Sequence, residues 1–436
     1  MRIISNSIKS NLKPLFNTMS DQRVAAITGQ AVARVAEMRG HLPVNRNSIV
    51  KFDPVVVKND AEATTIIAHA RFPELVRAFL QHKIQHGSAV EQSLYTSMSW
   101  RDEVSRLISK RPLVFMGGSD LTKLPDGRIL GGAAQDWDRV GTDHEHLNSH
   151  LRLNDFLSYD EMMLSALLGV SGSSHFINDG NRYNAARPGA PGTFEQRGII
   201  VGLVGARFER EDRMESSYIL PPVRHPRMHP DLRRTWQDFL RIEPPAPDNF
   251  NAQAYQARIR LSAEMLLFEA DRRARIANKK AYVYIVGLGL GVWQVDADQP
   301  RLYVDVFAQV IKDLGSQLTE LGTLEFAWID VASANRQNME AIAASHGVDV
   351  LFSKRNPAAR LPADKAEQLL VLSYAWDSNS FPGNEYWMGS LTASGDPAAA
   401  CMSTIAELHN PVINPSFLGR LELLGALVLC VVNYHK

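Results

Sequence analysis

The chain has 436 residues, 45% of them hydrophobic, and its 47 basic residues are balanced by 47 acidic ones. This length is sufficient for two or three domains with a substantial core. The balanced charge excludes the basic excess of many nucleic-acid-binding proteins and the acidic excess of many disordered ones, so we expect no nucleic-acid partner.

Two cysteines, Cys401 and Cys430, lie in apolar surroundings far from each other. Their spacing predicts neither a disulfide nor a zinc site, and isolated thiols are typical of a reducing compartment, so we expect a cytoplasmic protein. Residues 1–20 carry three basic residues and no acid, a composition that fits a targeting segment as well as a short surface helix. Both interpretations stay open.

Residues 1–110 predict an all-helical N-terminal region ahead of the main domain. An Ala/Val-rich pattern covers residues 21–40, and a longer amphipathic pattern covers residues 60–85. Ser99, followed three residues later by Asp102, forms a capping-box signature. The second domain is expected to span residues 111–436.

The first half of this second domain mixes both kinds of element. Residues 111–118 predict a strand ending in a glycine turn, residues 158–170 a helix, and residues 197–210 a strand with β-branched residues. A segment rich in Pro and Arg, about 224–251, predicts a crossover, and residues 254–279 predict a long helix.

From residue 281 onward strands and helices alternate. Apolar strands are expected at residues 281–287, 324–331, 348–353 and 368–375. Helices are expected at about residues 300–321, 335–346 and 397–409. Apolar strands separated by helices indicate an α/β fold, in which helices flank a mostly parallel sheet. The apolar run at residues 423–432 is about half of the ~20 residues that cross a bilayer, so no membrane span is expected.

A glycine loop follows the first strand of this alternating region. It contains Gly287, Gly289 and Gly291 and ends with Val292 and Trp293. Alternating glycines let main-chain N–H groups approach an anion, and a helix that begins behind them favours negative charge, which suits a diphosphate. The spacing differs from the dinucleotide-binding fingerprint and from the P-loop. A tight packing turn is the alternative interpretation.

A second loop follows the strand at residues 368–375. Asp377 closes that strand at the edge where open α/β sheets bind ligands. Amide groups, a Pro-Gly turn and aromatic rings suit a sugar or a base. The candidate binding residues are Trp376, Asn379, Phe381, Gly383 and Asn384, with further aromatic faces at Tyr374, Tyr386 and Trp387.

Three carboxylates belong to the same region, namely Asp377, Glu385 and Asp396. Carboxylates stabilise the oxocarbenium-like state of glycosidic cleavage and activate water, and they also pair with a guanidinium. The alternative interpretation makes Asp377 a turn former, Asp396 a helix N-cap and the aromatic residues part of the core.

A third loop, NDGNRYN, contains Asn178, Asn181 and Arg182. These residues either contact a ligand or form an Asn-Gly turn network. The histidines lack metal-ligand spacing, so no metal site is predicted.

The four stretches FINDGNRYN, RGIIVGLVGARFER, GLGLGVW and AWDSNSFPGNEYW together resemble the macrodomain family of ADP-ribose binders and hydrolases. More closely, they resemble its MavL-like class, which removes ADP-ribose from arginine. The likeness begins near Ser158 and continues to the end of the chain. It implies a macrodomain-like fold and no cofactor.

The resemblance also implies roles for the loops. The glycine loop would hold the diphosphate, and the Asp377 loop would hold the distal ribose and the scissile bond. Acidic residues of the class act in catalysis at positions that match Asp377, Glu385 and Asp396. Glu385 stands in place of an aspartate, the spacing to Asp396 is one residue longer, and the order of the two ligand loops is permuted relative to common macrodomains.

The implied function is hydrolysis of the N-glycosidic bond between ADP-ribose and a protein arginine. The implied partners are ADP-ribose and a mono-ADP-ribosylated protein, with ubiquitin as one candidate, and the implied compartment is the host cytosol if the protein is a secreted effector. A non-catalytic ADP-ribose reader is the alternative, because every feature except the carboxylates serves binding equally well.

Overall fold

The computed structural model describes residues 42–116, 121–243, 249–391 and 395–426. The basic leader at residues 1–20 and Cys430 lie outside these described residues. Within them, no helix combines the length and apolar character that crossing a membrane requires.

An eight-stranded mixed sheet forms the centre of the described structure, in the order β11-β1-β5-β6-β10-β7-β8-β9. Its strands are β1 (Thr65–His69), β5 (Leu168–His175), β6 (Arg197–Leu203), β7 (Ala281–Val286), β8 (Leu321–Ala327), β9 (Asp349–Ser353), β10 (Leu369–Ala375) and β11 (Leu421–Leu424). β6, β10, β7, β8 and β9 run parallel, so their carboxyl ends share one edge. β5 is antiparallel to both β1 and β6.

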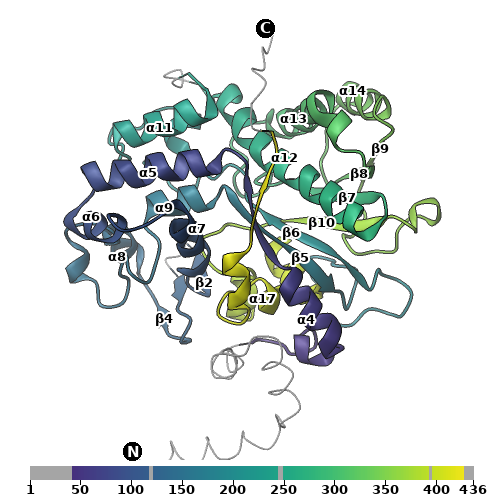
Figure 1. Ribbon diagram of the computed structural model, residues 1–436, viewed down its shortest axis with the longest axis horizontal. Helices are drawn as coiled ribbons and strands as arrows, with labels where there is room; N and C mark the ends of the chain where they lie inside the picture. The colour runs from purple at the N-terminus through teal and green to yellow at the C-terminus, as the bar shows by residue number, and fades with distance from the viewer. Residues whose placement is uncertain (1–41, 117–120, 244–248, 392–394, 427–436) are drawn as a thin grey trace, which may run out of the picture.

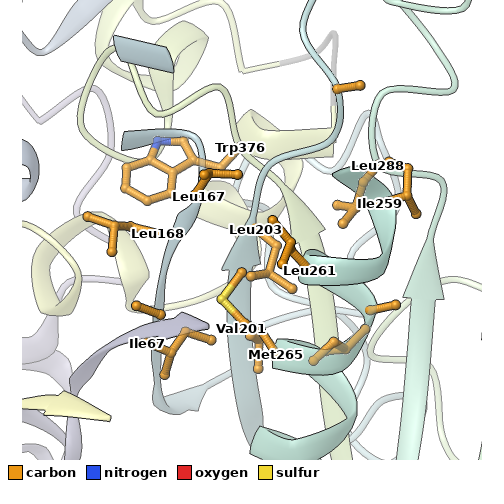
Figure 2. Packing of buried hydrophobic residues seen from close by; sticks show 14 of the residues in the cluster. Ile67, Leu167, Leu168, Val201, Leu203, Ile259, Leu261, Met265, Leu288 and Trp376 are labelled. Atoms are coloured by element: carbon orange, nitrogen blue, oxygen red, sulfur yellow. The ribbon is translucent and has the colours of Figure 1, made fainter. Parts of the chain in front are cut away.

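Helices cover this sheet, as the sequence predicts for a mostly parallel α/β fold (Figure 1). The helices of the second half are α12 (Ala252–Ala277), α13 (Gln299–Leu314) and α14 (Ser333–Ala344). Asn251 caps α12 by accepting a hydrogen bond from the backbone N–H of Ala254 at 3.0 Å, and Asn278 ends the helix in the left-handed conformation. Leu261 and Met265 of α12 lie beside Val201 and Leu203 of β6 (Figure 2).

Shorter helices surround these layers. They are α4 (Pro54–Ala63), α5 (Phe72–His86), α6 (Ala89–Tyr95), α7 (Trp100–Ser109), α8 (Ala134–Arg139), α9 (Tyr159–Ser165), α10 (Ser216–Ile219), α11 (Pro230–Leu240), α15 (Asn384–Met388), α16 (Gly395–Met402) and α17 (Ile405–Leu408). Short 3-10 helices span Ile49–Lys51, Glu145–Leu147, Gly315–Gln317, Ala363–Lys365 and Pro415–Gly419. A small antiparallel sheet contains β2 (Val114–Met116), β3 (Leu121–Lys123) and β4 (Ile129–Leu130).

The prediction of an all-helical N-terminal region is wrong, because β1 is a strand of the main sheet. Ile66 pairs with Val170 of β5 on one side and with Leu421 of β11 on the other. β1 is buried along its whole length, and its β-branched residues suit a strand. The amphipathic pattern at residues 60–85 hid it, because helices α4 and α5 flank these few residues closely.

Other local predictions differ from the structure in similar ways. The helix expected at residues 158–170 ends at Ser165, and β5 begins at Leu168. The crossover at about 224–251 contains α11. The capping box is confirmed, since the Ser99 hydroxyl accepts the Asp102 N–H at 3.3 Å and the Asp102 carboxylate accepts the Ser99 N–H at 3.0 Å.

Candidate active site

Three loops gather at the edge of the sheet where β6, β10 and β7 end. β10 pairs in parallel with both β6 and β7, so the Asp377 loop lies between the loop after β6 and the glycine loop after β7. The loop after β6 and the glycine loop also touch each other, since a Cβ atom on Gly205 would lie 2.3 Å from the Leu288 carbonyl oxygen. Glycine at position 205 therefore permits this close approach.

Arg207, in the loop after β6, links the other two loops. Its guanidinium is fully buried and donates hydrogen bonds to the Asn379 amide oxygen and to the Glu209 carboxylate. The same guanidinium lies 5.1 Å from the centre of the Trp293 ring in the glycine loop, a distance at which a cation and an aromatic face attract. Arg207 thus fixes the Asp377 loop relative to the glycine loop.

Asp377 stands at the centre of this arrangement, and part of its surface is exposed. One carboxylate oxygen accepts the Asn379 N–H at 3.0 Å, and the other accepts the Asn384 side-chain N–H at 3.2 Å. Burial raises the pKa of Asp377 above its ordinary value despite the opposing charge of Arg207. The Glu209 carboxylate contributes to the same increase in pKa.

Asn384 is held by a strand from a distant part of the sequence. Its amide oxygen accepts the Phe115 N–H of β2 at 3.0 Å, and its amide nitrogen donates to the Phe115 carbonyl at 3.1 Å. This pair of bonds imitates a strand pairing and orients the N–H that contacts Asp377. The small sheet therefore positions the candidate catalytic loop.

Asp396 lies in the first turn of α16 and is 7% exposed. Its carboxylate accepts the backbone N–H of Gly383 at 2.9 Å and that of Asn384 at 3.1 Å, which ties the loop to the helix. Burial, followed by the negative charges of Asp377 and Glu385, raises the pKa of Asp396 to about 8.

Gly383 has a backbone requirement of its own. Its φ of 89° lies in the left-handed region, and a Cβ atom there would stand 2.9 Å from the Cβ of Ala400.

Glu385 lies in the first turn of α15 and is partly exposed. It adjoins Asn384, whose backbone N–H the Asp396 carboxylate accepts, and its negative charge helps to raise the pKa of Asp396. The structure therefore brings together the three predicted carboxylates and adds Glu209.

The glycine loop uses its glycines for different purposes. Gly289 has a φ of 80°, and a Cβ atom on Gly287 would lie 2.9 Å from the Leu290 side chain. Gly291 has open space where a Cβ would be, and its neighbour Val292 is 88% exposed. Packing thus accounts for Gly287 and backbone conformation for Gly289, whereas Gly291 presents its backbone to solvent.

The aromatic residues predicted to offer faces to a ligand lie in the core. Trp376 is 3% exposed and Phe381 is 1% exposed. The Trp376 indole N–H donates to the Ser380 carbonyl at 3.1 Å, and the Arg111 guanidinium lies 4.4 Å from its ring centre. Tyr374, Tyr386 and Trp387 are buried as well. The core interpretation is the correct one for these rings, because the segment from Arg111 to β2 and helix α16 pack against the loop.

Arg111 is a residue of this site that the sequence did not reveal. Its side chain is 1% exposed, and its Nε donates to the Leu107 carbonyl at 2.7 Å. Burial lowers the pKa of Arg111 to about 9, and the nearby Asp377 carboxylate acts in the opposite direction. A second guanidinium therefore stands near the carboxylates from the side of β2.

The loop with Asn178 packs against α16. Asn178 donates to the Asn184 amide oxygen at 3.2 Å, and Asn184 donates to the Ala398 carbonyl at 3.1 Å. These bonds match the turn-network interpretation for Asn178. Asn181 and Arg182 are exposed on the same loop, and their contact with a ligand stays a prediction.

Among the described residues, no group of three His, Cys, Asp or Glu side chains is arranged to hold a metal ion.

The family model of MavL-like ADP-ribosylhydrolases matches residues 44–222 and 224–430 of the chain. The chain belongs to this family.

Two curated relatives agree with this assignment to the MavL-like ADP-ribosylhydrolases. ADP-ribosylarginine hydrolase CG3568 of Drosophila melanogaster is 36% identical over 397 aligned positions, covering 82% of this chain and 77% of the relative. ADP-ribosylarginine hydrolase CG2909 of the same organism is 33% identical over 454 aligned positions, covering 94% and 89%.

Sequence reasoning missed several residues of the site in this MavL-like ADP-ribosylhydrolase. Arg207 and Glu209 lie in one of the stretches that carry the resemblance. The sequence placed both inside a strand at residues 197–210, whereas β6 ends at Leu203 and leaves them in the loop that follows, where open sheets bind ligands. Arg111 and Phe115 gave no such signal, since they reach the site only through tertiary packing.

Proposed function

We propose that this protein hydrolyses the N-glycosidic bond between ADP-ribose and a protein arginine side chain. The observation that carries the proposal is the cluster of Asp377, Glu385, Asp396 and Glu209 beside the glycine loop. A carboxylate cluster can pair with the guanidine of the substrate and stabilise a developing oxocarbenium ion. Both relatives bear the name ADP-ribosylarginine hydrolase, which supports the arginine linkage.

The reaction needs a binding group and a base. The bond between the distal ribose carbon and the guanidine nitrogen breaks, and its electron pair stays on nitrogen. A water oxygen bonds to the ribose carbon and loses a proton to a carboxylate, and that proton ends on the released guanidine. Products are free ADP-ribose and an arginine guanidinium.

The carboxylates suit different parts of this reaction. Asp396, with a pKa of about 8, is mostly protonated at neutral pH and already holds two backbone N–H groups, so it is a poor base there. We assign to Asp377 the orientation of the ribose or guanidinium. We assign water activation to the partly exposed Glu385, while the glycine loop holds the diphosphate through backbone N–H groups.

The mixed sheet, with five neighbouring parallel strands that present ligand loops at one edge, supports a macrodomain-like fold for the catalytic part. That assignment is part of the proposal. The substrate is a mono-ADP-ribosylated protein, for which ubiquitin is one candidate to be tested.

The deciding experiment follows free ADP-ribose released from proteins modified on arginine, glutamate or serine. We expect release from the arginine-linked substrate alone. Asp377→Asn preserves the shape of the side chain and removes its charge, so turnover should fall by roughly two to four orders of magnitude. Asp364→Asn, at an exposed acid that precedes β10 whereas Asp377 follows it, is the matched control and should retain full activity.

Two outcomes would contradict the proposal. An absence of release at high enzyme concentration, together with ADP-ribose binding in calorimetry, would identify a reader instead. Unchanged turnover in Asp377→Asn would remove the Asp377 loop from the catalytic site while leaving the hydrolase activity in place.

A further inference from the structure

Trp328 follows β8 directly and stands beside the glycine loop. β8 pairs with β7 in parallel up to Ala327 opposite Val286, so the residue after Ala327 lies next to the start of the loop at Gly287. Trp328 is 61% exposed. An exposed tryptophan at the ligand edge of a parallel sheet is an unusual use of so large an apolar ring.

The orientation of this ring is fixed. The Trp328 backbone N–H donates to the Ser353 carbonyl at 2.8 Å, and its indole N–H donates to the Arg355 carbonyl at 3.2 Å. Its φ of 60° lies in the left-handed region, which bulky residues rarely adopt. A strained backbone of this kind persists only where the surroundings hold it, and such positions cluster at ligand sites.

Burial of the predicted aromatic faces makes Trp328 the stronger candidate for base stacking. Trp376 and Phe381 lie in the core, and Trp293 is partly covered beneath Arg207. Among the described aromatic residues that directly follow a strand of the main sheet, Trp328 is the one with a largely exposed ring.

We propose that Trp328 is the stacking platform for the adenine ring of ADP-ribose. This inference rests on the proposed function and adds the orientation of the ligand. Across the sheet edge, the order is the carboxylates after β6 and β10, the glycine loop after β7 and Trp328 after β8. The same order joins distal ribose, diphosphate and adenosine in the ligand.

The spacing of these groups fits the ligand. Neighbouring strands lie about 4.8 Å apart, so β10 and β8 are roughly 10 Å apart with β7 between them. A diphosphate at the centre therefore places adenosine on the side of β8.

Calorimetry with ADP-ribose tests the platform directly. Trp328→Ala should weaken binding by roughly ten- to a hundred-fold, the usual consequence of losing one base–aromatic stack. Trp328→Phe keeps a ring and should recover most of the affinity. Ile276→Ala, at a 71% exposed residue of α12 near the opposite edge of the sheet, is the matched control and should bind normally.

A second variant separates binding from folding. Asn adopts the left-handed region more readily than Trp, so Trp328→Asn should unfold at no lower temperature than the wild type while losing affinity. In the wild type, ADP-ribose should also change the tryptophan fluorescence, and this change should shrink in Trp328→Phe.

The outcomes distinguish this inference from the proposed function. Wild-type protein that binds no ADP-ribose would overturn both. Equal affinity in the wild type and Trp328→Ala, with hydrolysis intact, would overturn the platform alone. A loss confined to turnover of modified protein, with unchanged affinity for free ADP-ribose, would also overturn it, because the ring would then contact the protein substrate.

Discussion

Asp396 and Asp377 show how neighbouring carboxyl groups acquire different properties from their surroundings. Asp396 is nearly enclosed and holds the backbone of the loop, whereas Asp377 keeps an exposed part and is contacted by asparagine side-chain and backbone N–H groups. Burial raises the pKa of both groups. The proton that Asp396 retains at neutral pH limits repulsion within the cluster.

Because Asp396 holds this proton in the folded protein, we expect the free energy of unfolding to depend on pH. The folded pKa of Asp396, about 8, exceeds the ordinary value of 3.8, so its favourable contribution is complete below about pH 4 and is lost as pH rises through 8. Asp396→Asn should therefore show a smaller decrease in the free energy of unfolding between pH 5 and 8.5, as measured by urea titration. The difference should reach one to several kcal/mol, at about 1.4 kcal/mol per pKa unit. Parallel pH profiles for the two proteins would contradict it.

At the scale of secondary-structure elements, the glycine loop and the small sheet contribute to the candidate site in different ways. The glycine loop exposes its backbone at Gly291, and its conformation uses Gly289 at a φ of 80°. The small sheet acts at a distance, because Phe115 of β2 holds Asn384 and thereby Asp377. A segment next to the predicted N-terminal region thus supports the candidate site.

The two glycines Gly289 and Gly291 make a matched pair for mutation. Gly289→Ala forces an L-residue into the left-handed region and should lower the free energy of unfolding by about 1 kcal/mol. Gly291→Ala has open space for its methyl group and should leave stability unchanged while weakening ADP-ribose binding. Thermal unfolding and calorimetry on both variants measure the two effects. Normal ADP-ribose affinity in Gly291→Ala would remove that position from the diphosphate site.

On the scale of the whole molecule, stability should also decline in acid. His82 of α5 lies in a cluster with His86 and with His229 at the start of α11, and α5 and α11 lie side by side (Figure 1). Burial, followed by the charge of Lys83 and the other histidines, lowers the pKa of His82 to about 4. A histidine that stays neutral in the fold favours folding above pH 6.5, and this contribution is lost as pH falls toward 4.

His82→Gln should therefore lose less stability than the wild type between pH 6.5 and 4.5. Urea unfolding at the two pH values gives the comparison, and His225→Gln, at an exposed histidine, is the control. The same slope in all three proteins would show that protonation of His82 does not govern the acid limit.

The sequence predicted the part of the fold whose signals are local. The apolar strands after residue 281 and the helices between them are present with shifted bounds, since β8 ends at Ala327 rather than at residue 331 and α13 ends at Leu314. They could be predicted because a strand buried on both faces is a continuous apolar run. β1 was missed because it is a short strand between two helices, and the start of β5 was missed because it follows α9 closely. Asp377 and the glycine loop could be proposed as site candidates because both follow strands, whereas Arg111 and Phe115 reach the site only through packing between distant segments.

The pairing of β1 with β11 has a consequence for how the protein is made. Arg420, just before β11, donates to the Ala61 carbonyl just before β1, across 359 residues of chain. At a synthesis rate of about 5–20 residues per second, roughly twenty to seventy seconds pass between the synthesis of β1 and that of β11. Until β11 is made, one edge of this buried, apolar strand has no neighbour, and unpaired strand edges favour aggregation.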